Sequence, residues 1–581
     1  MKGYLIFDLK LANYILKKKY FFLNKKNVVF ITDKISIYEL FKAWNIQIIC
    51  LDGKINDKKR KEIFLQNYLF IDKKIKNLGK NNYLIFNKIK LNTIHNTNKF
   101  EVFRCYVGIK YLYHSLKIVI KKKKIKEIIF FEDLGSNLLC KNFYTKIIEF
   151  FCNKNKLIFN TKKINRLTIF ESIASYFKYV LITILKFREA TFKKLINFLY
   201  QKFFIFFSNK LFNKKQIASI GPLFDLAYLK NNFLDTGLNK LLKVPLKKQK
   251  EENLIHISKR NFNNLDDIFI WYLKEKNDKN IEFYREIISK AQNYFEQKRI
   301  KKIFWGVSPE PLLRNLIEYL KKKKYSINGL QHGGKYFIMN DDLYHKDSDY
   351  YLCNNYFSYG FPKTFNKKKY ARDIKILNSG CFKSFKYENT FKKIEKLNND
   401  TILYIPIGLS KFLMPVIETS PTTRFFLQKK ICKTLDEIRN FKKFVKILPL
   451  SYFKNITLNY NQLEANPIYF ELHKYKSLKI NSHNLISSYK NLKPKIIIMD
   501  SLSTPLYELS SSNSEIILFL DKFNQPKKDV LSILKKRFFI VKNIKEMMSC
   551  INLISNGKKN KFNDNSFYEK FYKQKKFNLD I

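Results

Sequence analysis

The stretch "IIIMDSLSTPLYELSSSNSEIILFLD", residues 496–521, decides the fold. It begins with an isoleucine-rich apolar run, passes through serine, threonine and proline, and ends with a second apolar run. Short apolar, β-branched runs bounded by polar turns are typical of buried strands. A proline that follows serine and threonine marks the first turn of a helix. The stretch therefore predicts a strand, a helix and a second strand, which is the repeating unit of a parallel sheet.

The same alternation recurs along most of the 581 residues. The other buried runs that we interpret as strands lie at 27–33, 46–52, 126–137, 156–161, 300–308, 325–334, 374–382, 400–408 and 444–451. A chain of this length is too long to fold around a single hydrophobic core, so we expect it to divide into domains. The predicted fold class is α/β, with two Rossmann-like domains that face a cleft.

The predicted domains meet near residues 390–395. Residues 1–390 are expected to form an N-terminal Rossmann-like domain on the acceptor side, and 395–555 a C-terminal Rossmann-like domain for a nucleotide donor. Residues 556–581 are polar and are expected to form a tail that is only partly ordered.

A helical insertion is predicted at about 165–215. This segment is apolar and aromatic, with lysines spaced along it, so it either packs on the core or lies in the plane of a membrane surface. No run of about 18 uncharged apolar residues occurs, so a spanning helix is not expected. Asp8 and Lys10 interrupt the apolar start of the chain, which is not the pattern of a cleavable signal peptide.

The formal net charge is +62. Lysine is enriched together with asparagine, isoleucine, phenylalanine and tyrosine, and it is spread along the whole chain. A generic basic surface explains this pattern, and a selected affinity for anionic membranes or phosphorylated substrates is the alternative. Nucleic-acid binding is not favoured, because no zinc-finger, RNA-recognition or helix-turn-helix signature occurs. The eight cysteines form no CxxC pair, which is typical of free thiols in a reducing compartment.

The polar residues that follow the run at 496–500 are candidates for binding a phosphate. Ser501, Ser503 and Thr504 offer hydroxyl groups next to the free backbone N–H groups of a helix start. Glu508 follows one turn later and could accept hydrogen bonds from ribose hydroxyls. The alternative interpretation is a simple helix cap.

Two other strand ends carry charged residues. Lys446 lies in "FVKILPLS" (444–451) and could contact a diphosphate, or it could be an ordinary solvated lysine. Asp133 follows Glu132 in "FFEDLGSN" (130–137), where a carboxylate could act as a general base or could belong to a turn.

The segment "LQHGGKYF" (330–337) is the fourth candidate. Gly333 and Gly334 allow a sharp turn and the close approach of a ligand. His332 could deprotonate a hydroxyl group near neutral pH, or it could be a structural histidine. The nearby "DDLYHKDSD" (341–349) has no spacing diagnostic of metal ligands, so no metal is expected.

These motifs carry a resemblance to a known family. The "QHGG" turn, "SDYYLCNNYFSYGF" (348–361) and "MDSLSTPLYEL" (499–509) resemble the GT-B transferases that build bacterial surface carbohydrates, above all the surface-polysaccharide transferases with a QHGG motif. The chain is also similar to teichoic-acid glycerophosphotransferases, capsule-export transferases and bacterial sialyltransferases. The resemblance covers about residues 300–545. "EDLG" (132–135) departs from the sialyltransferase acidic motif at Leu134, and the usual His-Pro motif is Leu448-Pro449 here.

The resemblance implies a function. The chain would be a glycosyltransferase that moves a sugar from a nucleotide-activated donor to a surface glycan or lipid-linked acceptor, in the cytoplasm or at the inner face of the inner membrane. His332, or otherwise Asp133, would be the base, and Ser503 and Thr504 would contact the donor phosphate. A polyol-phosphate transferase of the same fold and a non-catalytic scaffold are the alternatives. No cofactor is expected.

Overall fold

The computed structural model describes most of the chain. The described residues are 1–17, 27–81, 84–86, 89–91, 99–132, 141–163, 217–220, 234–235, 241, 262–305, 311–331, 333–340, 350–362, 374–394, 396–409, 420–447, 466–520, 522–523, 525–558 and 560–575. The insertion predicted at about 165–215 lies outside them. Within the described ranges, no helix is both long and apolar enough to cross a membrane.

The first sheet is parallel and has the strand order β3-β2-β1-β6-β7. Its strands are β1 (Lys2–Leu5), β2 (Val28–Thr32), β3 (Ile48–Cys50), β6 (Glu127–Glu132) and β7 (Ile158–Lys163). The helices of this part are α1 (Leu9–Lys17), α2 (Ile35–Ala43), α3 (Asp57–Asn81), α5 (Lys99–Lys123) and α6 (Lys141–Lys154), and β4 (Leu84–Phe86) pairs with β5 (Ile89–Leu91) in a separate antiparallel pair. Every residue of β2 is buried, which explains its uninterrupted apolar sequence.

The second sheet is also parallel, with the order β13-β12-β11-β10-β8-β9. Its strands are β8 (Ile217–Ile220), β9 (Leu234–Asp235), β10 (Lys302–Trp305), β11 (Ser326–Leu330), β12 (Asn355–Ser358) and β13 (Lys375–Asn378). The helices α10 (Leu265–Lys298) and α11 (Pro311–Lys322) contribute apolar residues to its core, among them Ile287 and Leu316.

The third sheet is parallel, with the order β16-β15-β14-β17-β18-β19. Its strands are β14 (Asn398–Ile405), β15 (Lys442–Lys446), β16 (Leu478–Asn481), β17 (Pro494–Met499), β18 (Glu515–Phe519) and β19 (Phe539–Val541). The helices are α14 (Ser384–Lys392), α15 (Pro421–Glu437), α17 (Tyr469–Leu472), α18 (Leu485–Leu492), α19 (Thr504–Leu509), α20 (Lys528–Arg537), α21 (Ile544–Ser555) and α22 (Ser566–Phe571). Counted along the chain, the order is 3-2-1-4-5-6, which is the order of a Rossmann dinucleotide-binding sheet.

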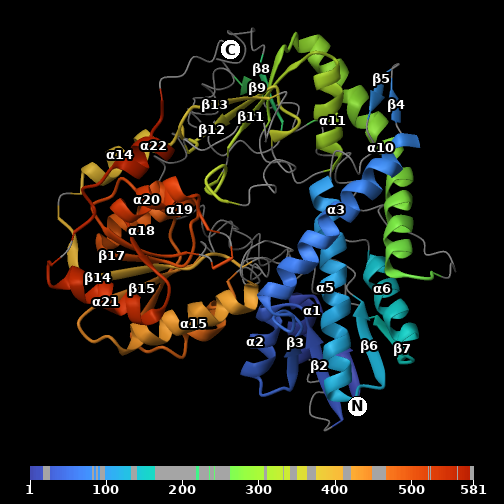
Figure 1. The fold of residues 1–581 in the computed structure, drawn as a ribbon, viewed down its shortest axis with the longest axis horizontal. Helices are drawn as coiled ribbons and strands as arrows, with labels where there is room; N and C mark the ends of the chain where they lie inside the picture. Colours follow the sequence, from blue (N-terminus) through green and yellow to red (C-terminus); the bar gives the residue numbers. More distant parts are fainter. Residues whose placement is uncertain are drawn as a thin grey trace, which may run out of the picture.

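The predicted α/β class with Rossmann-like parallel sheets is confirmed. The predicted N-terminal domain, residues 1–390, contains two of these sheets and not one. The sequence has no signal for this division, because a buried parallel strand is the same kind of apolar run whichever sheet it joins. Figure 1 shows the first sheet in blue to teal, the second in green and yellow, and the third in orange and red.

The first and third sheets contact each other at the start of α15. Asp52, which follows β3, accepts hydrogen bonds from the backbone N–H and the hydroxyl group of Thr422 at 2.8 and 2.6 Å. Asp57 accepts a hydrogen bond from the Ser420 N–H at 2.9 Å. Arg60 forms a buried ion pair with Asp52. Carboxylates of the first part of the chain thus satisfy the free N–H groups at the start of α15.

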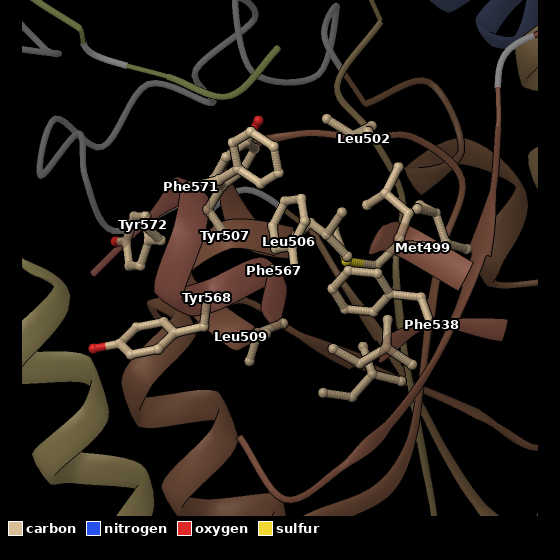
Figure 2. Close-up of a cluster of buried hydrophobic side chains, with 14 of the residues drawn as sticks. Met499, Leu502, Leu506, Tyr507, Leu509, Phe538, Phe567, Tyr568, Phe571 and Tyr572 are labelled. Carbon is tan, nitrogen blue, oxygen red and sulfur yellow. The ribbon is translucent and has the colours of Figure 1, made fainter. Parts of the chain in front are cut away.

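The C-terminal segment packs on the third sheet and reaches the second. The sequence predicts a partly ordered polar tail from residue 556, but Phe567 and Phe571 of α22 are fully buried against α19 and α20 (Figure 2). Beyond α22, Lys575 N–H donates to Ser379 O at 2.8 Å, and Cys381 N–H donates to Tyr572 O at 2.8 Å. The aromatic residues of this segment recur at helical spacing, so apolar burial offsets the entropy of ordering it.

Candidate functional site

The candidate site lies at the carboxyl ends of the third sheet. The strand order changes direction between β14 and β17, and ligands of open parallel sheets bind at such a switch point. The loop after β14 begins at Pro406, and the loop after β17 contains Ser501 and Ser503. The "MDSLSTPLYEL" segment (499–509) therefore lies at the position where the sheet topology predicts a ligand.

The three hydroxyl residues of this loop differ in exposure. Ser501 is buried, at 4% exposure, whereas Ser503 and Thr504 are partly exposed. Ser503 precedes α19 in an extended conformation, and its side chain makes no capping hydrogen bond to the helix. Ser503 therefore occupies the N-cap position without a side-chain capping hydrogen bond. Because α19 has only six residues, the hydroxyl groups matter more here than the helix dipole.

The glycine turn of the second sheet contacts this loop. Gly334 N–H donates to Thr504 Oγ1 at 3.3 Å, and Lys335 N–H donates to the Tyr507 hydroxyl group at 3.2 Å. The carboxyl end of β11 therefore meets the start of α19, 170 residues further along the chain. Because Thr504 accepts this bond, its own hydroxyl proton remains to be donated to another acceptor.

The turn has little room for side chains. A Cβ atom added at Gly334 would overlap the Tyr507 ring, with Cδ2 at 2.9 Å, and would lie 3.3 Å from the Ser503 carbonyl carbon. At Gly333 it would lie 3.3 Å from Thr504 Oγ1. The glycine pair is thus explained by the close approach of α19.

Gln331 braces the turn from within the second sheet. Its side chain is buried, Nε2 donates to Gly333 O at 2.6 Å, and Oε1 accepts from Tyr359 N–H at 2.9 Å. The amide therefore ties the turn to the end of β12. Gln331 was not predicted to be functional, although it is the first residue of the "QHGG" motif.

Lys446 is the last residue of β15, and β14 lies between β15 and β17 in the sheet. Its side chain is buried, and Nζ makes one long hydrogen bond, to Ile447 O at 3.4 Å. Burial lowers the pKa of the Lys446 ammonium group to about 8, and the negative charge of Glu508 opposes part of that change. The interpretation as a solvated lysine is therefore wrong, and Glu508 on α19 lies within electrostatic range of Lys446.

Asp500 lies at the candidate site and was not predicted to be a functional residue. It follows β17 directly and is 3% exposed. It accepts one hydrogen bond from β14, one from the loop after β14, and one from α15. The signal available in the sequence was its position, since it is the first polar residue after a four-residue apolar run.

The structure brings together Gly333, Gly334, Ser503 and Thr504. His332 and Asp133 lie outside the described residues, so their roles stay predictions. Asp133 follows β6 of the first sheet, whereas His332 follows β11 of the second. Among the described residues, no group of three or more His, Cys, Asp or Glu side chains is arranged to hold a metal ion.

The described groups suit an anion. Two partly exposed hydroxyl groups and a buried ammonium group are donors of the kind that bind phosphate oxygens. Glu508 adds a hydrogen-bond acceptor on the same short helix.

No known protein family matches the chain, and no curated protein matches it either.

Several solved structures are similar to part of the chain. Sucrose-phosphate synthase from Thermosynechococcus elongatus has a TM-score of 0.31 and 7% identity, over 55% of this chain and 77% of that one. A glycosyltransferase from Rickettsia africae has a TM-score of 0.31 and 10% identity, over 61% and 93%. UDP-GlcNAc 2-epimerase from Neisseria meningitidis, bound to UDP-GlcNAc, has a TM-score of 0.31 and 11% identity, over 61% and 96%. Scores and identities this low leave the function to be inferred from the chain's own residues.

Proposed function

We propose that this protein is a glycosyltransferase that moves a sugar from a nucleotide-activated donor to a bacterial surface glycan, such as O-antigen or capsule, or to its lipid-linked precursor. The observation that carries the proposal is the contact between the Gly333–Gly334 turn and Thr504 at the switch point of the third sheet. A donor phosphate and an acceptor hydroxyl group that bind at the two sides of this contact would be close enough to react.

Each residue has a stated role in the proposal. The hydroxyl groups of Ser503 and Thr504 hold the donor phosphate, and the Lys446 ammonium group stabilises the negative charge that develops on it as the sugar leaves. Glu508 accepts hydrogen bonds from the ribose. His332, or otherwise Asp133, removes the proton from the acceptor hydroxyl group. Ser501 acts through the backbone of the loop, because its side chain is buried.

The motif resemblance supports the class of acceptor. The "QHGG" and "MDSLSTPLYEL" segments resemble transferases of bacterial surface carbohydrates, and these segments contain the residues that meet at the site. Association with the inner membrane is part of the proposal through the segment at about 165–215.

A thermal-shift screen against nucleotides and nucleotide sugars tests the proposal. One nucleotide class is expected to raise the melting temperature of the wild type, because a ligand that binds only the folded state stabilises it. The double variant Ser503→Ala/Thr504→Val should lose that shift. The matched control is Ser532→Ala/Ser549→Ala, since these exposed serines bond only to backbone carbonyls of their own helices. If both double variants keep the shift, the assignment of the donor site is wrong.

Product analysis separates the two transferase alternatives. Sugar transfer breaks the bond between the anomeric carbon and the phosphate oxygen, so the whole phosphate stays on the nucleotide. Polyol-phosphate transfer breaks a phosphorus–oxygen bond of the diphosphate, so one phosphate leaves with the acceptor. Mass spectrometry of the nucleotide product, after incubation with the donor that the screen identifies, distinguishes the two outcomes. A non-catalytic scaffold gives neither product.

A further inference from the structure

The buried carboxylate of Asp500 joins three elements at the switch point of the third sheet. Oδ1 accepts from Ile407 N–H at 2.6 Å. Oδ2 accepts from Gln428 Nε2 at 2.7 Å and from the Tyr404 hydroxyl group at 3.2 Å. All three groups donate, so the ionised carboxylate fits this position better than the protonated acid.

Ile407 is held at both of its backbone polar groups. Its N–H donates to Asp500, and its carbonyl group accepts from Gln428 Nε2 at 2.9 Å. Ile407 lies two residues after β14, in one of the two loops that flank the switch point. Asp500 begins the other loop, which continues to Ser503 and Thr504. The network therefore fixes one loop against the other.

A buried cation supports the carboxylate. Arg424 is 7% exposed, and its Nη1 donates to the backbone carbonyl group of Asp500 at 3.3 Å. Burial raises the pKa of the Asp500 carboxyl group, and the charge of Arg424 and the three hydrogen bonds oppose that rise. Arg424 and Gln428 lie one helical turn apart on α15, so one face of this helix contributes both groups.

We infer that Asp500, together with Gln428, is a positioning residue for the phosphate site. It holds the loop after β14 against the segment that carries Ser503 and Thr504, so the site is already formed before the ligand binds. The inference rests on the proposed function, because it concerns the same site. Asp500 is too buried to touch the ligand and acts through the backbone of these loops. A purely structural role is the competing explanation, since breaking any buried polar network destabilises a fold.

The variant Asp500→Asn tests the inference with inorganic pyrophosphate as the probe. Asparagine keeps the size of the side chain but cannot accept hydrogen bonds at both of its terminal atoms. Isothermal titration calorimetry on the full chain should show a Kd for pyrophosphate at least tenfold higher than that of the wild type. The 31P chemical shift of bound pyrophosphate should change as well, because the loop that surrounds it has moved.

Glu515→Gln is the matched control. Glu515 is a fully buried carboxylate on the neighbouring strand β18, but it lies at the amino end of that strand and accepts hydrogen bonds from Lys561 N–H at 3.0 and 3.1 Å. Loss of this carboxylate should lower the melting temperature and leave both the Kd and the 31P shift of bound pyrophosphate at their wild-type values. If Glu515→Gln weakens pyrophosphate binding as much as Asp500→Asn does, general destabilisation explains the effect and the inference fails.

Gln428→Met decides the question if Asp500→Asn does not fold. Methionine keeps the length of the side chain but removes the bonds to both Ile407 and Asp500, so it should also raise the Kd about tenfold. One outcome would overturn this inference and leave the proposed phosphate site intact. In that outcome, Ser503→Ala/Thr504→Val loses pyrophosphate binding, whereas Asp500→Asn binds pyrophosphate as the wild type does. If Asp500→Asn does not fold, wild-type binding by Gln428→Met takes its place. No pyrophosphate binding by the wild type would overturn both the inference and the proposed phosphate site.

Discussion

Gly334 follows β11 of the second sheet and contacts α19 of the third within the proposed site. We expect Gly334→Ala to lower the melting temperature, since its Cβ would overlap the Tyr507 ring, and overpacking of this kind costs about 1–3 kcal/mol. Nucleotide or pyrophosphate binding should weaken together with stability. Gly333→Ala is the control, because its Cβ would meet only the Thr504 hydroxyl group, at 3.3 Å. Equal melting temperatures for the two variants would contradict the packing explanation.

Lys446 gives the proposed phosphate site a pH dependence. Its ammonium group has a pKa lowered to about 8 by burial, so the free protein loses this positive charge as the pH rises through 8. A bound anion favours the charged form and raises the pKa. The part of the pyrophosphate affinity that Lys446 supplies should therefore be constant below pH 8 and fall, by up to tenfold per pH unit, between about pH 8 and 9.5.

The control for this profile is Lys446→Met, measured by calorimetry over the same pH range. It should bind pyrophosphate more weakly than the wild type at pH 7 and show no fall between pH 8 and 9.5. A fall in Lys446→Met that matches the wild type would assign the titration to another group.

The residues at the site were partly predictable from the sequence. Ser503, Thr504 and the glycine pair could be found because each follows an apolar run, and the carboxyl ends of parallel strands are where such sheets bind ligands. Their contact with one another could not be found, because 170 residues separate Gly334 from Thr504 and one sequence carries no record of long-range pairing. Asp500 was overlooked as a functional residue because a buried network reveals itself only through its partners.

At the scale of elements, strands were easier to predict than their grouping. The expected run at 496–500 overlaps β17 (Pro494–Met499), where a buried β-branched run has few alternatives to a strand. The run at 325–334 contains β11 (Ser326–Leu330). The short edge strands β16 and β19 were not predicted. Each has only three or four residues, and "LKIN" (478–481) alternates like an exposed edge, with Ile480 47% exposed.

Helix α22 lies in the segment that the sequence predicts to be a partly ordered polar tail. Because the helix is buried, its contribution to stability can be tested. Phe567 is fully buried, with its ring centroid 5.1 Å from Tyr507 and 5.3 Å from Phe538. We expect Phe567→Ala to cost about 3–5 kcal/mol, because it removes a large ring and leaves a cavity. The melting temperature should fall by several degrees, and proteolysis of the C-terminal segment should become faster.

Phe385→Ala on α14 is the control for that measurement, since the Phe385 side chain is 65% exposed. Its loss should change stability by no more than about 0.5 kcal/mol. Wild-type stability in Phe567→Ala would mean that α22 does not stabilise the third sheet in solution.

At the scale of the whole molecule, the third sheet is joined to each of the other two by both hydrogen bonds and a shared apolar cluster. The second and third sheets meet through short backbone contacts. Ile338 O accepts from Lys527 N–H at 2.9 Å, and Asn340 N–H donates to Gln525 O at 3.0 Å. The first and third sheets share apolar residues, since Ile35 and Cys50 lie in the same cluster as Phe425 of α15. The division of 1–390 into two sheets was not predictable, because it depends on which strands pair with one another, and buried parallel strands have the same kind of apolar sequence in either sheet.

The contact between the first and third sheets includes two carboxyl groups that face each other. Glu39 of α2 and Glu471 of α17 are each 3% exposed and share a hydrogen bond. Lys429 of α15 lies 2.9 Å from Glu471 and 4.0 Å from Glu39. Burial raises the pKa of Glu39 to about 7, and the neighbouring Glu471 adds to the rise, whereas Lys429 and Lys42 oppose it.

Glu471 is the ionised member of this pair. Burial alone would raise its pKa, but hydrogen bonds from Glu39, Lys474 and Lys429 lower it to about 2. Between about pH 4.5 and 7, the folded protein therefore keeps a proton on Glu39 that the unfolded chain releases. Stability supplied by this proton is present below pH 4.5 and is lost as the pH rises through 7.

We expect Glu39→Gln to remove that pH dependence. Glutamine keeps a hydrogen-bond donor toward Glu471 at every pH, so the melting temperature should fall less between pH 5 and 8 than it does in the wild type. Hydrogen exchange should show the same difference locally, with α2 and α17 less protected at pH 8 than at pH 5 in the wild type only. Glu62→Gln, at an exposed ion pair on α3, should keep the wild-type slope. An unchanged slope in Glu39→Gln would mean that this pair does not control how firmly the first sheet is held to the third.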